Sequence, residues 1–350
     1  MRLYVSSIVV FAGAVALGSI SGPAMTAEFL LPSARARRPA PSAKYEYIQV
    51  HMGVPVRIVL YAGDRAFAES AARAAFARIA QLDRMMSDYR PDSELRQIEE
   101  HAGEPVRVSA ELFDVLSRAS AIARATGGAF DPTVAPLVRL WREARVTRRL
   151  PDGAALEQAR TAVGWQRLEL YPSTSSIRLQ PGMRLDLGGI AKGYILQEAL
   201  MTMRGADVTR VMVEAGGDLV VGEPPPGRPG WHIATPEADL DLARRASALK
   251  DAALATSGPT AQFVEIDGVR YSHVVDPRTG MALTSDVVAY VIAADGATAD
   301  ALATALTVLG KEGAGTVLPR FPEAISSIFS RSSASGPGRI EKSAKRGQAP

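Results

Sequence analysis

Three short segments of the chain hold the residue types needed to bind a metal–pyrophosphate and act on it. Residues 186–193 read DLGGIAKG, residues 272–280 read SHVVDPRTG, and residues 299–306 read ADALATAL. In order, they supply a glycine-rich turn, a polar loop with one histidine, and a helix carrying hard oxygen donors. Each segment is a weak signal by itself, so the prediction rests on finding all three in one chain.

The first segment is typical of a strand that turns into a helix at about Ile190. Glycines at such a junction let main-chain N–H groups approach a ligand, and a helix N-terminus attracts anions. Lys192 adds a positive charge in the first turn. The pattern matches neither the Walker motif nor G-x-G-x-x-G. An ordinary tight turn followed by a solvated lysine is the alternative interpretation.

The third segment places Asp300 and Thr304 four residues apart, and therefore on one face of a predicted helix. A carboxylate and a hydroxyl are hard oxygen donors suited to Mg²⁺. Their neighbours are Ala and Leu, so this face would otherwise be apolar. Alternatively, Asp300 stabilises the helix N-terminus, and Thr304 is a half-buried residue that only contributes to packing.

Only one of the four histidines stands among other chemical groups. His51, His101 and His232 are interpreted as structural or surface residues, whereas His273 precedes Asp276 in a loop of polar residues. A histidine can take a proton from a hydroxyl nucleophile near neutral pH. The alternative is a hydrogen-bonded loop histidine with no catalytic part.

Two further loops are rich in glycine. Residues 127–133, GGAFDPT, could cradle a planar ligand or could simply end the preceding helix. Residues 214–218, EAGGD, lie between two predicted strands, where a β-bulge or a turn explains them equally well.

Composition narrows the class of protein. The chain has 350 residues, of which 47% are hydrophobic, and a formal net charge of only +3. That is enough apolar material for one large domain. Aromatic residues are sparse and do not alternate with basic ones, which argues against a nucleic-acid groove. The absence of cysteine excludes disulfides, thiol nucleophiles, zinc–thiolate sites, iron–sulfur clusters and a lipoprotein anchor.

The two ends of the chain differ from the rest. Residues 1–27 have a short basic start, an uncharged apolar run over 5–20 and small residues afterwards, which predicts a signal peptide cleaved near Ala24 or Ala27. The mature protein would then be periplasmic in a Gram-negative host, and an uncleaved inner-membrane anchor is the alternative. Residues 28–44 are predicted to be a Pro/Arg-rich linker, and residues 330–350 a disordered basic tail.

The remaining body, residues 45–329, is predicted to be a single domain. Hydrophobic periodicity indicates helices over 65–86, 110–126, 154–163, 190–203 and 297–309, with Ser109 as the N-cap of the second. It indicates strands over 45–52, 56–61, 168–171, 177–179, 211–214, 219–221, 231–234, 263–266, 271–275 and 287–292. Helices and strands come in mixed runs, so the expected class is α+β, a mixed sheet with helices packed on it.

Taken together, these segments resemble the ApbE family, the FAD:protein FMN transferases. The likeness covers about residues 50–320 in family order. The matching segments are 86–89, 93–95, 128–133, 186–193, 215–218, 256–258, 273–280 and 299–306.

The resemblance implies an activity. The family transfers FMN from FAD, with Mg²⁺, to a Thr or Ser hydroxyl of an acceptor protein through a phosphoester bond and releases AMP. The implied acceptor is a membrane-associated electron-transfer subunit. An FAD pyrophosphatase, in which water replaces the hydroxyl, and an FAD-binding or assembly protein of the periplasm without an acceptor are the alternatives.

The resemblance also implies roles for residues. Asp300 and Thr304 would coordinate Mg²⁺ together with the main-chain carbonyl of Gly189, and His273 would be the catalytic base. The implied FAD contacts are Met52, Tyr89, Ala129, Phe130, Asp131, Asp186, Lys192 and Val275.

Three positions depart from the family pattern. Val54 stands where the family has a threonine, Glu214-Ala215 where an asparagine is usual, and Pro259 begins a segment where an aromatic residue is common. Ligand contacts at these positions are therefore not carried over, whereas all three implied metal ligands are present.

Overall fold

The computed structural model describes residues 42–235, 239–259 and 263–330. The predicted signal peptide, nearly all of the predicted linker and the predicted tail from residue 331 lie outside the described residues. Within the described ranges, no helix has both the length and the apolar character needed to cross a membrane.

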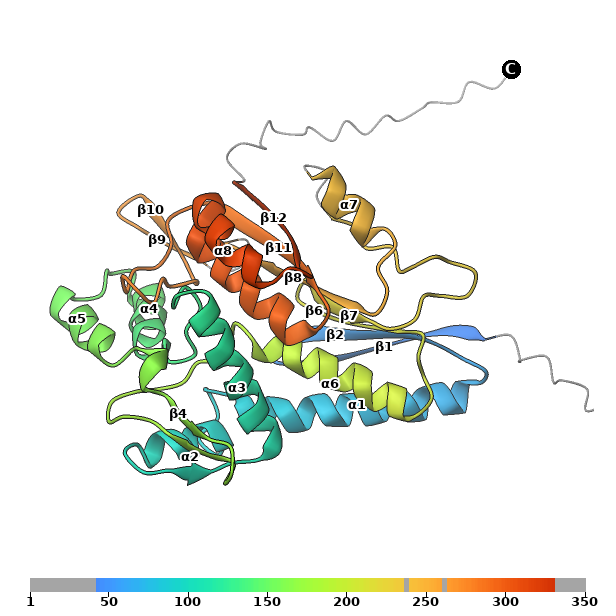
Figure 1. Cartoon of the computed structure of the whole chain (residues 1–350), viewed down its shortest axis with the longest axis horizontal. Coiled ribbons are helices and arrows are strands. Elements are labelled where there is room, and N and C mark those ends of the chain that lie inside the picture. The colour runs from blue at the N-terminus through green and yellow to red at the C-terminus, as the bar shows by residue number, and fades with distance from the viewer. Residues whose placement is uncertain (1–41, 236–238, 260–262, 331–350) are drawn as a thin grey trace, which may run out of the picture. The chain divides into compact units, whose positions relative to one another are not determined.

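A seven-stranded sheet forms the centre of the fold (Figure 1). All of its neighbouring strands pair antiparallel. In spatial order the strands are β1 (Ala43–His51), β2 (Val54–Ala62), β6 (Val211–Ala215), β7 (Asp218–Val221), β8 (Ala252–Ser257), β11 (Val287–Ala293) and β12 (Ile325–Ser330).

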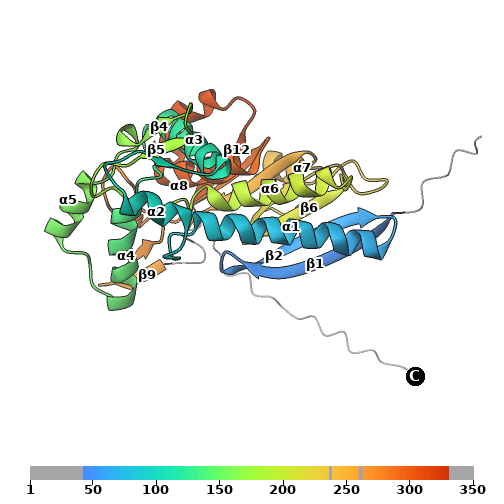
Figure 2. The same ribbon diagram turned by 90° about the horizontal axis from the view of Figure 1, so that it is seen from below.

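Three helices cover one face of this sheet, namely α1 (Arg65–Met86), α6 (Ala191–Gly205) and α8 (Gly296–Val317). Helices α1 and α6 run side by side, as Figure 2 shows from below. The short helix α7 (Leu240–Ala246) packs on the opposite face, where Leu242 and Ala246 join a second apolar cluster.

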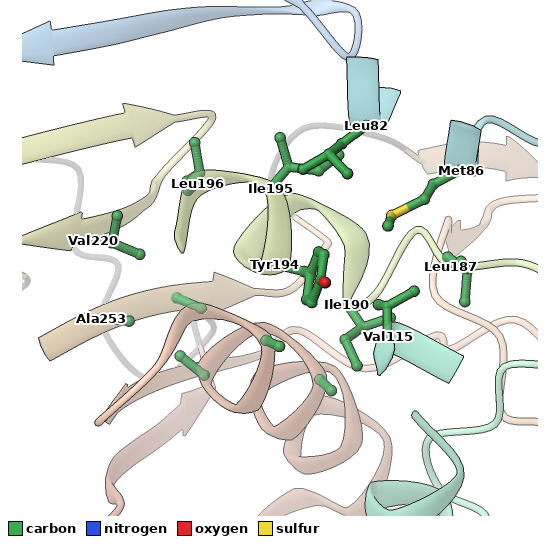
Figure 3. Packing of buried hydrophobic residues seen from close by; sticks show 14 of the residues in the cluster. Leu82, Met86, Val115, Leu187, Ile190, Tyr194, Ile195, Leu196, Val220 and Ala253 are labelled. Carbon is green, nitrogen blue, oxygen red and sulfur yellow. The ribbon is translucent and has the colours of Figure 1, made fainter. Parts of the chain in front are cut away.

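The core between sheet and helices is built largely around α6. Tyr194 and Ile195 lie among Leu82 of α1, Val115 of α3 (Ala110–Ala125) and other buried side chains (Figure 3). Along β7, Val220 points into this core while its neighbours Leu219 and Val221 belong to the second cluster, as the alternation of a strand requires. Burial on both sides fixes the register of the sheet, and hence the place of its turns.

Smaller elements surround one end of the sheet. They are α2 (Glu94–Glu100), α4 (Ala135–Thr147), α5 (Gly153–Thr161), the sheet of β3 (Val106–Arg107), β5 (Ser176–Arg178) and β4 (Glu169–Tyr171), and the hairpin of β9 (Phe263–Ile266) and β10 (Val269–Ser272). Helix α4 packs on the β9–β10 hairpin through Leu137 and Trp141 in a third apolar cluster.

The α+β class and the packing of helices on the sheet are confirmed, and most predicted elements appear within a few residues of their expected bounds. Ser109 caps α3 as predicted, accepting a hydrogen bond from the Leu112 N–H at 3.2 Å. Residues 231–234 are not a strand, because only Trp231 pairs, in an isolated bridge with Leu249. Strand β8 was not predicted, since its sequence AALATS has little of the β-branched and aromatic character that marks strands.

Candidate active site

A cleft opens beside the N-terminus of α6, and the space inside it, which includes open solvent, is about 800 Å³. Nine of the predicted site residues line it: Tyr89, Ala129, Phe130, Asp131, Asp186, Gly189, His273, Val275 and Thr304. Residues separated by more than 200 positions in sequence thus share one cavity.

The close crossing of α6 and α8 brings two of the predicted segments together. A Cβ on Gly193 would lie 2.0 Å from the main-chain oxygen of Gly296, which no side chain could tolerate. At this crossing the Gly193 N–H donates to Oδ2 of Asp300 over 3.0 Å. The first turn of α6 therefore fixes the orientation of the buried Asp300 carboxylate.

Gly189 lies against Thr304 in the same region. A Cβ on Gly189 would be 3.0 Å from Oγ1 of Thr304 and 3.3 Å from the Phe130 ring. A larger residue here would have to displace these side chains, so the glycine lets the main chain pass close to α8 without a shift. The structure thus gathers the three predicted metal ligands, Gly189, Thr304 and Asp300, at the start of α6.

This donor set fits Mg²⁺. It comprises one carboxylate, one hydroxyl and one main-chain carbonyl, and within the described residues no group of three or more His, Asp or Glu side chains could hold a metal by itself. Mg²⁺ is commonly held by one or two carboxylates together with substrate phosphates, rather than by a complete protein cage. Burial raises the pKa of Asp300, opposed by the charge of Lys192 and the Gly193 N–H. A cation beside this carboxyl would favour its charged form.

Lys192 forms an ion pair with Asp218 at the start of β7. Asp218 is only 1% exposed, and its other oxygen accepts a hydrogen bond from the Thr256 N–H over 2.8 Å. The pair therefore ties α6 to the ends of β7 and β8. Lys192 is not among the residues that line the cleft, and neither are Asp300 and Met52.

Met52 lies in the turn between β1 and β2, with a positive φ of 53°. Its N–H donates to Oδ2 of Asp83 over 3.0 Å, which attaches the turn to α1. Met52 is therefore held in the β1–β2 turn, next to the C-terminal part of α1.

Arg142 of α4 connects three parts of the cleft. Its guanidinium pairs with Asp88 and, over 3.2 Å, with Asp186, and it stacks on the Tyr89 ring at 4.5 Å from the centroid. Burial and the nearby Asp88 raise the pKa of Asp186, whereas Arg142 lowers it. Tyr89 is 75% exposed, so the ring face away from Arg142 can receive a planar ligand.

Asp131 holds its own loop together. One oxygen accepts from the N–H and the hydroxyl of Thr133, at 2.8 and 2.7 Å, and the other accepts from the Trp165 N–H over 3.0 Å. Burial raises the pKa of Asp131, and these hydrogen bonds oppose the shift. The carboxylate therefore supports the loop that presents Ala129 and Phe130 to the cleft.

His273 follows β10 and lies exposed on the cleft wall. The loop after it is held by Asp276, which pairs with the Arg278 guanidinium over 2.9 Å, and by the Trp141 indole N–H, which donates to the Gly280 carbonyl over 2.9 Å. These contacts hold the loop that follows His273 in one shape.

Helix α4 supplies cleft residues that the sequence reasoning missed: Val134, Val138, Arg142 and Arg145. The helix itself was not predicted. Its buried face, Leu137, Trp141 and Ala144, repeats at helical spacing and could have revealed it.

The fold and the cleft define an enzyme of the flavin transferase class. Two solved structures share the fold. The ApbE protein of Thermotoga maritima matches with a TM-score of 0.73 and 31% identity, over 83% of this chain and 95% of that one. The flavin transferase ApbE of Vibrio cholerae matches with a TM-score of 0.71 and 28% identity, over 83% and 94%.

The chain belongs to the ApbE family, whose model matches residues 52–329. It is similar to the FAD:protein FMN transferase of Treponema pallidum, with 32% identity over 299 residues that cover 80% of this chain and 82% of the relative. It is equally similar to the enzyme of that name from Klebsiella pneumoniae, with 32% identity over 81% and 88%. The chain is therefore a transferase.

Proposed function

We propose that this protein transfers FMN from FAD to a Thr or Ser hydroxyl of an acceptor protein, in the presence of Mg²⁺, and releases AMP. The observation that carries the proposal is the meeting of Gly189, Thr304 and Asp300 at the first turn of α6, beside a cleft that Gly189, Thr304 and His273 line. The names of the relatives support the same reaction.

FAD is held by its shape and by its charge. The apolar and aromatic wall of Phe130 and Tyr89 suits a planar ring system, and the N-terminus of α6 offers a positive dipole end to the pyrophosphate. Arg142 and Arg145 add positive charge along the same cleft. Asp300, Thr304 and the Gly189 carbonyl would hold Mg²⁺, which when bound screens the phosphate charge that builds up as the bond breaks.

The chemistry requires one bond to form and one to break. The acceptor oxygen attacks the phosphorus of the FMN half, the bond from that phosphorus to the bridging oxygen breaks, and AMP leaves with the bridging oxygen. His273 takes the proton of the attacking hydroxyl, which is a poor nucleophile until it is deprotonated. The rest of the catalysis is the alignment of acceptor, phosphorus and leaving group.

A transfer assay tests the proposal. The protein is incubated with FAD, Mg²⁺ and a membrane fraction of its source organism, because the proposed acceptor is a membrane-associated electron-transfer subunit. Flavin fluorescence is then followed in a denaturing gel, and AMP is measured. We expect a fluorescent band and an equal amount of AMP, both abolished by EDTA.

The variant Asp300→Asn is the matched control, since an amide oxygen can still accept the Gly193 hydrogen bond but brings no negative charge. We expect it to fold and to lose transfer. AMP with free FMN and no labelled band would instead make water the acceptor, and the absence of AMP would exclude the reaction altogether.

A further inference from the structure

The C-terminal end of α4 carries an exposed basic and apolar surface next to the cleft. We name it the α4 rim and define it as the exposed Val146, Arg148, Arg149 and Leu150 together with the half-buried Arg145. Val146 is 84% exposed and Leu150 47%, and these two aliphatic residues lie four positions apart in the sequence.

The α4 rim continues the cleft. One face of α4 lines the cleft from Val134 through Val138 and Arg142 to Arg145. The helix ends at Thr147, and Arg148 and Arg149 follow directly as exposed residues. The lining therefore changes from apolar near the glycine turn to basic at the outer end of the helix.

The rim lies at the end of α4 that is farther from the glycine turn. The N-terminal end of α4 lies by the glycine turn, because Val134 bridges Arg184 and the Asp186 N–H donates to Pro132. Thirteen residues of helix span about 20 Å. Residues beyond Thr147 are therefore placed to contact a molecule that covers the mouth of the cleft.

Within the described part of the chain, two arginines of the rim differ from Arg142 in their ionic contacts. No salt bridge there involves Arg148 or Arg149, whereas Arg142 pairs with Asp88 and Asp186. Arginines at a helix C-terminus also interact favourably with the negative end of the helix dipole. In addition, the Arg148 N–H donates a hydrogen bond to the Ala144 carbonyl over 2.8 Å and caps the helix. Dipole stabilisation does not account for the exposed Val146 and Leu150, and arginine is enriched in protein interfaces.

We propose that the α4 rim is the docking surface for the acceptor protein, and that the contacting segment of the acceptor carries carboxylates beside apolar side chains. This inference rests on the proposed transferase function, which requires a protein hydroxyl to enter the cleft. Complementary charge at the rim guides the acceptor to the cleft and fixes the register of its hydroxyl residue.

The test compares two charge reversals of equal size. The variant R148E/R149E alters the rim, and R244E/R245E alters adjacent arginines on α7, which lies on the far side of the sheet (Figure 1). Initial rates of flavin incorporation into the fluorescent band are measured against the amount of membrane fraction at saturating FAD. Circular dichroism checks that both variants fold.

We expect R148E/R149E to raise the half-saturating amount of membrane fraction at least about tenfold and to leave the KM for FAD unchanged, as expected for loss of a rim charge. Added NaCl should lower the initial rate of flavin incorporation more for the wild-type protein than for this variant, because salt screens exposed charges. R244E/R245E should behave as wild type.

Three results would overturn the inference. Equal saturation curves for wild type and R148E/R149E would leave the transferase intact and remove the docking surface. A raised KM for FAD, with the half-saturating amount of membrane fraction unchanged, would mean that the rim binds FAD and not the acceptor. The absence of any labelled band with the wild-type protein would reject the transferase, and the docking surface with it.

Discussion

Gly193 of α6 and Gly296 of α8 meet main chain to main chain, so that a Cβ on either would fall within 2.1 Å of the other's carbonyl oxygen. This contact sets the distance between the two helices. Because Asp300 lies one turn beyond Gly296 and accepts the Gly193 N–H, the same contact positions the carboxylate of the proposed metal site.

The variant Gly193→Ala should therefore lose stability and activity together. Overpacking against rigid main chain costs about 3 kcal/mol or more. Thermal unfolding and the transfer assay would measure both effects. The control is Gly205→Ala at the end of α6, where a Cβ meets nothing within 4 Å, and its unfolding free energy should change little. Equal stability of the two variants would contradict the close crossing.

Replacing Arg142 with Met should weaken FAD binding and destabilise the cleft. The guanidinium separates Asp88 from Asp186 and supports the Tyr89 ring, so its loss leaves two neighbouring carboxylates unopposed. We expect the KM for FAD to rise about tenfold and the unfolding free energy to fall by about 1–3 kcal/mol.

This loss of stability should depend on pH. Arg142 stabilises the carboxylates only while they are charged, and it lowers the pKa of Asp186, which burial and Asp88 hold above 3.8. The stabilisation is therefore present near neutral pH and lost as the pH falls through the pKa of Asp186. A difference in Tm between wild type and variant that does not shrink in acid would rule out this account.

Lys192 should be a stability determinant through Asp218. Lys192→Met leaves a buried carboxylate without its cation, which costs about 3–5 kcal/mol when a buried pair is broken on one side. The double variant K192M/D218N removes the charge as well and should recover part of the loss. Urea unfolding of the single and double variants measures the coupling, and strictly additive losses would show that the pair is not coupled.

His273→Ala should separate chemistry from binding. If the imidazole takes the proton of the acceptor hydroxyl, its removal should lower kcat about 10²–10⁴-fold. The KM for FAD should change little, since the side chain is exposed on the wall of the cleft. His232, exposed and away from this cleft, provides the control as His232→Ala. A raised KM with unchanged kcat would make His273 a binding residue.

The sequence by itself determined the class of fold, most of the elements and the candidate residues of the site. Residues 186–193 and 299–306 could be recognised from local sequence. A glycine turn, a lysine in the first turn of a helix and two oxygen-bearing residues at i and i+4 each depend only on residues close by in the chain. The placement of Gly189 and Thr304 together follows the prediction. The family resemblance also implied a role for Asp131, although it did not predict the hydrogen bonds of this residue.

Tertiary structure decided which charges meet. Arg142 lies 54 residues from Asp88 and 44 from Asp186, and Lys192 lies 26 residues from Asp218, so neither set of contacts follows from local spacing. These pairings depend on how α4 packs on the β9–β10 hairpin and on how α6 crosses α8. The free energy of that packing comes from the burial of apolar surface, which is non-directional and does not specify which residues meet. The partners of Arg142 and Lys192 are therefore known only from the folded chain.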